Sequence, residues 1–476
     1  MKASSTDYPP PKKMAIITSY FKGETYGLLG PQIAATIIED HGGCKCIVIA
    51  VTREDDKTTL KTALADYFAA QRPIIGFSAL SGREDLFSLA GELRTEGATT
   101  ILAGPQANVD FSGEQGWRHH PHRFRGFWDC FDFGLQGPAE QVVPLLSRLG
   151  KNDGSPILIP GLLYLDKEGG VRQNLPQKWD HNYLGKVRWD NIYRLTQDGI
   201  APFNIGTGQV LQHIGCPHAS RVTEPQIDYP ASIRKGKGQK IKLGLKGCSF
   251  CDVAADKGFH GKLDTETVIA QIQCLPQMPN GRKIPFELIN ENPLPALSGL
   301  LQEAHSRSIG ISQIHLTLRA DGLISGLQHL RTALHSAGQL GIYVLLSSIG
   351  FESFDNRILR NLNKGLKVET NLQAIRLVRQ LKEEFGDAFG YSSREGANHG
   401  FIHPTAWDTE ETEAEIQKTI YLYGLQNDIL PPHSTPLIIH HASGLADWIR
   451  EIERRERLWF KRYGTVIGWW DAPRRI

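Results

Sequence analysis

The residues best suited to chemistry are cysteines that stand in two similar settings. A Cys-x-x-Cys pair lies in Gly247-Cys248-Ser249-Phe250-Cys251-Asp252, and a tight turn at this spacing can bring two thiolates to one metal. Cys216 follows Gly215 and precedes Pro217-His218. We therefore predict a metal centre that uses Cys216, Cys248 and Cys251. With His218 added, the same thiols could form a closed Cys3His zinc site. The remaining cysteines, Cys44, Cys46, Cys130 and Cys274, receive no role.

A second group of candidates is polar and follows apolar runs in the same half of the chain. The runs 285–289, 314–318 and 342–349 are each followed by a helical pattern, and repeated strand-then-helix units predict a parallel barrel. Functional groups in such barrels stand at the carboxyl ends of the strands. The polar residues at these ends are Glu287, Asn290, Glu291, Arg319, Ser347, Ser348 and Glu352.

The first 150 residues predict a different arrangement of strands and helices. Apolar runs alternate with helical patterns of 10–15 residues, which is typical of a doubly wound parallel sheet. The predicted strands cover 14–20, 46–51, 73–78, 99–104 and 131–135. Ligands bind outside the carboxyl ends of such sheets, where small residues let a bulky group approach the backbone. The candidates there are Ser78, Ala79, Leu80, Gly104, Pro105, Gln106, Gly137 and Pro138.

Length and composition limit the remaining possibilities. The 476 residues carry 53 Lys+Arg against 51 Asp+Glu, a balance that argues against nucleic acid as a partner. No apolar run reaches the roughly 18 residues of a membrane span, and the start resembles no signal peptide, so we expect a cytoplasmic protein. We predict a sheet domain at 14–150, a linker at 151–205, a barrel at 206–425 and a helical C-terminal extension at 426–476.

Several short motifs give the chain a resemblance to a known family. Gly30-Pro31, Gly76-Phe77-Ser78, Ala103-Gly104-Pro105 and Gly137-Pro138-Ala139-Glu140 resemble the motifs of the N-terminal domain of cobalamin (B12)-dependent radical SAM enzymes. In that family a Cys-x3-Cys-x2-Cys motif ends in Cys-Ser-Phe-Cys, as Cys248–Cys251 does. Gly244 occupies the place of the first cysteine, and Ile214-Gly215-Cys216-Pro217 resembles the missing left end. We interpret the motif as split by an insertion.

The resemblance implies a fold, cofactors and roles for these residues. The fold would be a Rossmann-like cobalamin-binding domain followed by a partial six-unit radical SAM barrel and a helical tail. Cys216, Cys248 and Cys251 would hold a 4Fe–4S cluster, and an external electron donor would reduce it. Phe250 and the strand-end residues would bind S-adenosylmethionine (SAM), with Arg319 on its carboxylate. The first loop, Ser19–Gly30, contains no histidine that could ligate cobalt.

The activity that follows from the resemblance is methylation of an unactivated carbon in a small-molecule substrate. The cluster would reduce SAM to give a radical that abstracts hydrogen, and cobalamin would donate the methyl group. Cyclisation or rearrangement, with or without cobalamin, is an alternative. A cluster held by two cysteines and another ligand is a second alternative. A non-catalytic zinc- or cobalamin-binding protein with a remnant barrel is a third.

Overall fold

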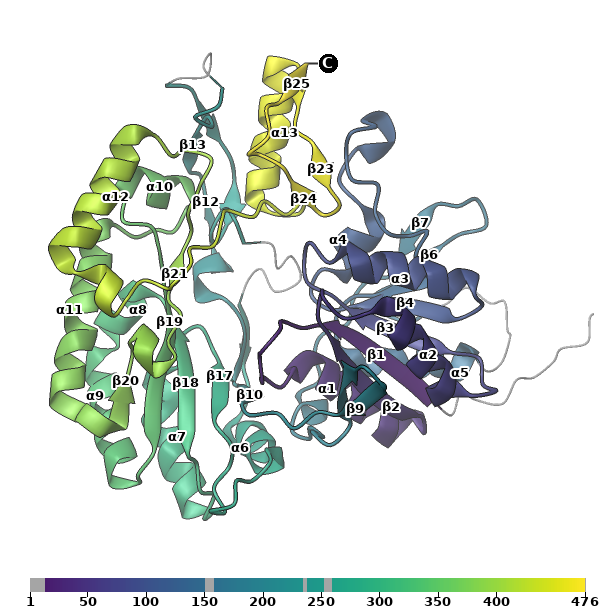
Figure 1. The fold of residues 1–476 in the computed structure, drawn as a ribbon, viewed down its shortest axis with the longest axis horizontal. Coiled ribbons are helices and arrows are strands. Elements are labelled where there is room, and N and C mark those ends of the chain that lie inside the picture. Colours follow the sequence, from purple (N-terminus) through teal and green to yellow (C-terminus); the bar gives the residue numbers. More distant parts are fainter. Residues whose placement is uncertain (1–12, 150–157, 234–237, 252–258, 476) are drawn as a thin grey trace, which may run out of the picture. The chain divides into compact units, whose positions relative to one another are not determined.

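The chain folds into two compact units, shown as a ribbon in Figure 1. The computed structural model describes residues 13–149, 158–233, 238–251 and 259–475. Unit 1 contains Met1–Gly206 with Tyr463–Thr465, and unit 2 contains Thr207–Arg462 with Val466–Ile476. Within the described residues, no helix is both long enough and apolar enough to cross a membrane.

Unit 1 is built on a parallel sheet with helices on both faces. Its central strands, in the order β5-β4-β3-β1-β2, are β1 (Lys13–Ser19), β2 (Lys45–Val51), β3 (Ile74–Ser78), β4 (Thr99–Ala103) and β5 (Phe133–Leu135). The helices are α1 (Leu29–Gly42), α2 (Lys57–Phe68), α3 (Glu84–Thr95), α4 (Ala107–Ser112) and α5 (Val142–Leu149). Strands covered on both faces are apolar throughout, and β1 and β2 are buried almost from end to end. The strand order reverses between β1 and β3, which is where such sheets bind ligands.

The segment for which we predicted a linker instead completes this sheet. Four more strands extend it to the order β7-β6-β5-β4-β3-β1-β2-β8-β9. They are β6 (Leu162–Leu165), β7 (Val171–Gln173), β8 (Ile192–Thr196) and β9 (Gly199–Pro202). β8 runs parallel to β2, and β6 runs antiparallel to β5. These strands lie at the two edges of the sheet, so their burial is partial and their sequences lack the continuous apolar runs of the centre.

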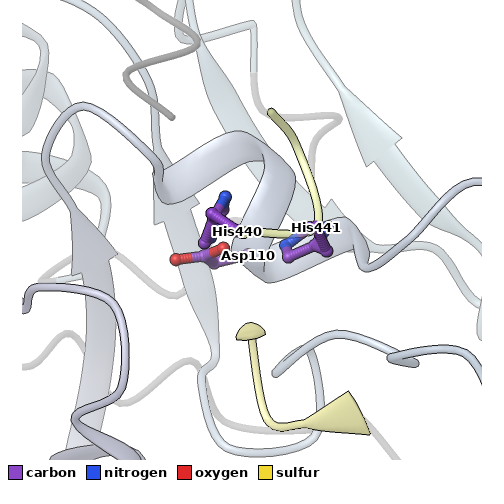
Figure 2. Close-up of side chains that lie close together, drawn as sticks. All are labelled: Asp110, His440 and His441. Atoms are coloured by element: carbon purple, nitrogen blue, oxygen red, sulfur yellow. The ribbon is translucent and has the colours of Figure 1, made fainter. Parts of the chain in front are cut away.

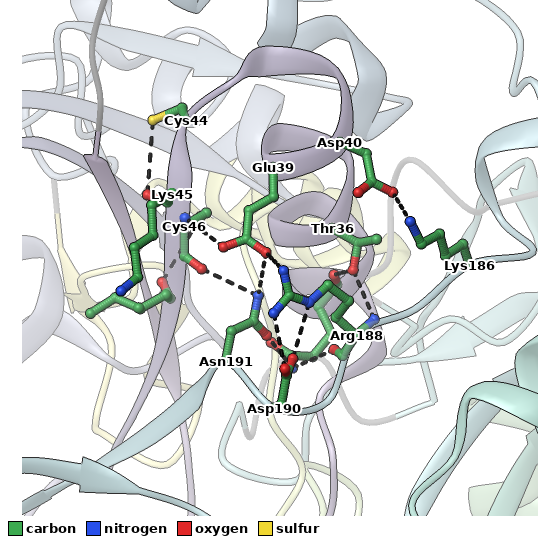
Figure 3. A network of polar contacts seen from close by, with 12 residues as sticks. Thr36, Glu39, Asp40, Cys44, Lys45, Cys46, Lys186, Arg188, Asp190 and Asn191 are labelled. Carbon is green, nitrogen blue, oxygen red and sulfur yellow. Dashed lines mark hydrogen bonds and ion pairs between the residues drawn. The ribbon is translucent and has the colours of Figure 1, made fainter.

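A polar network fixes the start of β8 to helix α1 (Figure 3). Arg188 pairs with Glu39 at 2.6 Å and with Asp190 at 2.9 Å. Asn191 donates a hydrogen bond to the backbone oxygen of Cys46 at 3.2 Å. Lys186 pairs with Asp40 on the same helix at 2.7 Å. Side-chain pairing therefore positions this segment, which is why its hydrophobic pattern is weak.

Unit 2 contains a six-stranded sheet in which the paired strands all run parallel, as the repeated strand-then-helix pattern predicts. The strands are β10 (Gly208–Leu211), β17 (Phe286–Ile289), β18 (Gln313–Leu318), β19 (Tyr343–Glu352), β20 (Phe389–Gly390) and β21 (Gly400–Phe401). The main helices between and after them are α6 (Thr265–Cys274), α7 (Leu294–Ser306), α8 (Ala320–Ser325), α9 (Leu327–Gln339), α11 (Val368–Phe385) and α12 (Glu410–Tyr423).

Burial alternates along β10 and β17. Val210, Leu288 and Leu316 are fully buried, whereas Gln209 and Glu287, on the opposite face, are only partly buried. Alternation of this kind means that one face packs against helices and the other carries the polar residues. The predicted SAM-binding residues Glu287, Ser348 and Glu352 are also partly buried.

The described residues between Cys216 and Cys248 form a long extension of two antiparallel strand pairs. β12 (Val222–Thr223) pairs with β15 (Leu245–Lys246), and β13 (Gln226–Asp228) pairs with β14 (Lys240–Lys242). Before and after it, β11 (His213–Gly215) pairs with β16 (Phe259–Lys262). Because β12 pairs with β15, the chain leaves this extension close to where it entered it. The insertion therefore separates the two halves of the cysteine motif in sequence and brings them back towards each other in space.

The C-terminal extension, predicted to be helical, contains one helix followed by short strands. Helix α13 (Gly444–Glu456) ends at Arg457, whose φ of +52° breaks the helical path. Short strands follow, β22 (Leu458–Trp459), β23 (Arg462–Tyr463), β24 (Val466–Ile467) and β25 (Arg474–Arg475). Trp448 of the helix lies in one core cluster with Trp407, and the two rings are 5.3 Å apart. The extension is therefore part of the hydrophobic core of unit 2.

Candidate active site

The Cys-x-x-Cys pair lies on the tight turn that the sequence predicts. The backbone N–H of Cys251 donates to the carbonyl oxygen of Cys248 at 3.2 Å, which closes the turn. Gly247 enters it with a φ of +69°, a conformation that favours glycine. Phe250, between the cysteines, packs at the edge of the hydrophobic core that contains Trp407. The thiols of Cys216, Cys248 and Cys251 are partly buried, and none of them is in a disulfide bond.

The two halves of the split motif meet at Gly247 and the short helix Pro217–Ser220. A Cβ atom built on Gly247 would lie 3.1 Å from the Cβ of Ala219. Among the described residues, however, Cys216, His218, Cys248 and Cys251 do not form a group whose ligand atoms all lie within 4.8 Å of one another. A single tetrahedral zinc ion gathers its ligands closely, whereas the thiolates of a cluster each hold a different iron.

Two cations act on the Cys248 thiol. Burial raises its pKa, and the charges of Lys364 and Arg319 oppose that rise. Lys364 is itself buried and lies 2.8 Å from Glu352 (Nζ to Oε1). Burial acts to lower the pKa of Lys364, but Glu352 and Cys248 more than compensate, so its pKa is raised and it stays charged. A positive environment of this kind suits a thiolate or an anionic cluster.

Glu352 itself stands at the end of β19 with a φ of +60°, in the left-handed region that residues with a Cβ rarely adopt. A Cβ on the neighbouring Gly350 would lie 2.6 Å from Lys364 Nζ and 2.7 Å from Glu352 Oε1. Glycine at this position therefore leaves room for the buried ion pair. Strain at such a strand end is frequent at functional sites.

The predicted carboxylates and amide at the end of β17 have polar neighbours. Gln209 donates to Glu287 at 3.0 Å, and Glu287 lies opposite Gln209 on β10 and His315 on β18. Asn290, largely buried, donates to Gln212 at 2.7 Å. The charges of Lys364, Arg319 and Glu287 all act on Glu291, whose pKa is raised, chiefly by burial. These carboxylates and amides therefore share one electrostatic environment with Cys248.

Arg319 and the serines of β19 have clear partners. Arg319 pairs with Asp321 through Nε at 3.1 Å and donates from Nη2 to the carbonyl oxygen of Lys364 at 2.7 Å. Ser347 donates to the carbonyl oxygen of Leu316 at 3.2 Å. Ser348 is partly buried and lies opposite Thr317 in the sheet. Within the described residues, Arg319 Nη1 has no hydrogen-bond partner, so this group is available to a ligand.

In unit 1, the predicted small residues stand at the carboxyl ends of the strands. The side chain of Ser19 accepts a hydrogen bond from the backbone N–H of Leu80 at 2.9 Å, across the point where the strand order reverses. Leu80 is 52% exposed although it is apolar. Gly104 and Gly137 have φ values of +109° and +101°. The remaining predicted residues at this edge are Gly30, Ser78, Ala79, Pro105, Gln106 and Pro138.

Sequence reasoning missed two residues at the candidate site in unit 2. Lys364 and Asn363 lie in the run Leu362-Asn363-Lys364-Gly365, after the short helix α10 (Asn356–Asn361). From the sequence we predicted no role for these two side chains. A lysine in a polar run usually lies in solvent. The neighbouring Gly365 was the available signal.

Other histidines cluster outside this site. His440 and His441 are buried with their rings 4.4 Å apart (Figure 2). In unit 2, His403 lies 3.3 Å from Asp408 and 3.1 Å from Glu413. Asp408 also accepts hydrogen bonds from Thr405, which gives it a structural role in the turn before α12.

Comparison with known proteins places the fold. No protein-family model and no curated protein sequence matches the chain. Among solved structures, a similar one is OxsB, a cobalamin-dependent S-adenosylmethionine radical enzyme with aqua-cobalamin and S-adenosylmethionine bound, at a TM-score of 0.63 and 14% identity. The chain has the fold of the cobalamin-dependent radical SAM enzymes. The match covers 96% of this chain but only 64% of OxsB.

A second similar structure also contains cobalamin. It is the radical S-adenosylmethionine methyltransferase TsrM from Kitasatospora setae, with cobalamin and a 4Fe–4S cluster bound. The TM-score is 0.57 at 15% identity, over 93% of this chain and 75% of TsrM. At these identities the likeness establishes the fold, as the sequence motifs predicted, and leaves the activity to be argued from the residues.

The residues present fit the groups that this fold holds. Unit 2 offers three thiols outside any disulfide bond, two of them on one closed turn, with the charges of Lys364 and Arg319 acting on Cys248. Unit 1 offers an exposed leucine and glycines with positive φ at the carboxyl edge of its sheet. Thiolates beside cations suit an iron–sulfur cluster, and an edge without bulky side chains suits a large ring.

Proposed function

We propose that the chain is a cobalamin-dependent radical SAM enzyme that methylates an unactivated carbon of a small-molecule or natural-product precursor. The observation that carries the proposal is the closed Cys248–Cys251 turn with two cations acting on Cys248, in a chain with this fold. When bound, the cluster with SAM supplies one-electron chemistry at carbon, and cobalamin supplies the methyl group.

The chain's own residues would hold the cluster and tune its surroundings. Cys216, Cys248 and Cys251 are the ligands in this proposal. Lys364 is the buried cation that offsets their negative charge, and Glu352 keeps it charged and fixed at 2.8 Å. Since the thiolates and Lys364 come from different segments, folding of unit 2 creates the site before the cluster enters.

SAM would bind beside the cluster through the strand-end residues. Arg319 has Nη1 available for the SAM carboxylate, while its bonds to Asp321 and to the Lys364 carbonyl hold the guanidinium in place. Glu287, Asn290 and Glu291 would meet the amino group, and Ser347, Ser348 and Glu352 the ribose or methionine portion. Phe250 would pack near the adenine.

Cobalamin would bind at the carboxyl edge of the sheet in unit 1. Leu80 would cover one face of the ring, and the backbone at Gly104 and Gly137 would approach it. The same edge offers Gly30, Ser78, Ala79, Pro105, Gln106 and Pro138. The first loop has no histidine, so in this proposal that loop would supply no imidazole to the cobalt.

The test is turnover of labelled SAM by the anaerobically reconstituted full-length protein. With a reductant and cobalamin, we expect 5′-deoxyadenosine to form, and transfer of the label to candidate substrates to separate methylation from cyclisation or rearrangement. The Cys248→Ala variant should lose deoxyadenosine formation, whereas Cys274→Ala should retain it, because Cys274 stands on helix α6 without a proposed role. A loaded wild-type protein that leaves SAM intact contradicts the proposal.

A further inference from the structure

One turn of the chain contacts both halves of the split cysteine motif. The carbonyl oxygen of Asn363 lies 3.0 Å from Nε2 of His218, two residues after Cys216. The side-chain Nδ2 of the same residue donates to the carbonyl oxygen of Gly247 at 2.6 Å, immediately before Cys248. Asn363 therefore bridges two segments that are far apart in sequence.

The residues just before Asn363 also contact the second half of the motif, the Cys248–Cys251 turn. The backbone N–H of Ser249 donates to the carbonyl oxygen of Leu362 at 2.9 Å. The Ser249 hydroxyl, which is fully buried, donates to the carbonyl oxygen of Asn361, also at 2.9 Å. Three hydrogen bonds thus attach the Cys-x-x-Cys turn to residues 361–363, two to backbone carbonyl oxygens and one from the Asn363 side chain.

The backbone of this turn is shaped for the bridge. Asn363 has a φ of +49°, and asparagine is one of the few residues other than glycine that adopts this conformation readily. Gly365 follows with a φ of +71°, and a Cβ there would lie 3.1 Å from Cε1 of His218. The turn therefore fits closely against the segment that carries Cys216.

The insertion makes such a bridge necessary. In an unsplit motif, short chain connections set the distance between the cysteines. Here 31 residues separate Cys216 from Cys248, so tertiary contacts must set it. The insertion is fixed in turn by Asp228, whose carboxylate accepts hydrogen bonds from Arg357 at 2.8 Å and from Arg360 at 3.1 Å.

We propose that Asn363 is a positioning residue that holds the two halves of the split cysteine motif in register for cluster binding. Its carbonyl group positions the Cys216 half through His218, and its amide positions the Cys248 half through Gly247. This inference rests on the proposed function for the identity of the bound group, but the geometry it describes belongs to the apo chain.

The test uses Asn363→Gly and Asn363→Asp in the full-length protein. Glycine accepts the positive φ and keeps the carbonyl contact, but it removes the side-chain bonds to the Gly247 carbonyl oxygen and to Thr223 Oγ1; aspartate keeps the shape but cannot donate. In the apo protein we expect alkylation of Cys248 to be faster by about fivefold or more in both variants, the effect of losing at least one hydrogen bond. Cys274 in the same sample serves as the reference thiol. After reconstitution, both variants should hold less iron than wild type, with a changed electron paramagnetic resonance signal.

The matched control is Asn280→Gly, which removes a 3.1 Å bond to the Arg282 backbone in the turn before β17. It should change neither Cys248 alkylation nor the cluster signal. Unchanged Cys248 alkylation in Asn363→Gly would overturn the proposal, as would equal acceleration at Cys274, which indicates general loosening. If wild type takes up no iron, the proposed function fails, and the alkylation comparison still decides the role of Asn363.

Discussion

The ion pair between Lys364 and Glu352 gives the sharpest prediction about the stability of unit 2. Their side chains are 6% and 12% exposed, and the charged atoms are 2.8 Å apart. Replacement of Lys364 by methionine removes the cation and strands the carboxylate. Space at Gly350 is so limited that water has little room to replace the ammonium group.

Loss of one partner from a buried pair costs about 3–5 kcal/mol, because the remaining charge is left without compensation. We therefore expect Lys364→Met to lower the free energy of unfolding of unit 2 by about that amount. The double variant Lys364→Met/Glu352→Gln removes both charges and should recover most of the loss. The control Lys418→Met breaks an exposed pair with Glu415 and should cost less than about 1 kcal/mol.

The assay is urea unfolding followed by hydrogen exchange of β19 peptides, which reports unit 2 separately from unit 1. The apo protein is used, so cofactor loading does not enter. The reasoning is refuted if Lys364→Met is no more destabilising than Lys418→Met. It is refuted equally if the double variant is as unstable as the single one, since the stranded carboxylate would then not be the cause.

Three further predictions concern other parts of the chain. Burial acts to raise the pKa of Glu395, but Lys382 and backbone donors lower it to about 2 from 4.5; the carboxylate therefore stabilises the fold above about pH 4.5 and loses this effect as the pH falls towards 2. The deficit of Glu395→Gln in urea unfolding, about 1–2 kcal/mol at pH 7, should vanish over that range, and a deficit independent of pH would contradict this origin. Leu80→Asp should weaken cobalamin binding, measured by corrin absorbance, by about tenfold or more through lost apolar contact, whereas Leu422→Asp on α12 should not; equal affinities would remove Leu80 from the site. Arg188→Ala should cost about 1–3 kcal/mol and increase hydrogen exchange in β8, because it leaves Glu39 without its cation; unchanged exchange there would show that the network does not hold the strand.

The central strands of unit 1 could be predicted because burial on both faces requires a continuous apolar sequence, and such a run is itself the signal for a buried strand. β2 and β3 are covered on both faces, so they are continuous apolar runs between helical patterns. The edge strands β8 and β9 could not be predicted in this way. Their positions depend on Arg188 and Asn191, polar residues whose partners, Glu39 on α1 and Cys46 on β2, lie about 150 positions earlier in the chain.

The candidate site likewise has parts that local sequence patterns predict and parts that they do not. The Cys248–Cys251 turn and the polar strand ends follow from local spacing and periodicity, and the sequence alone predicted them. Lys364 and Asn363 act through burial and through contacts with distant segments, which local patterns do not encode. The strands of the insertion were also missed, since Lys240 and Lys242 alternate with Ile241 over too few residues to indicate a strand.

The most direct measurement of the central claim is the iron and sulfide content of the anaerobically reconstituted protein. The account predicts about four irons and four sulfides per chain for wild type, loss of both in Cys248→Ala, and retention in Cys274→Ala. One zinc per chain with no iron would contradict it, and so would iron that remains bound after Cys248 is replaced.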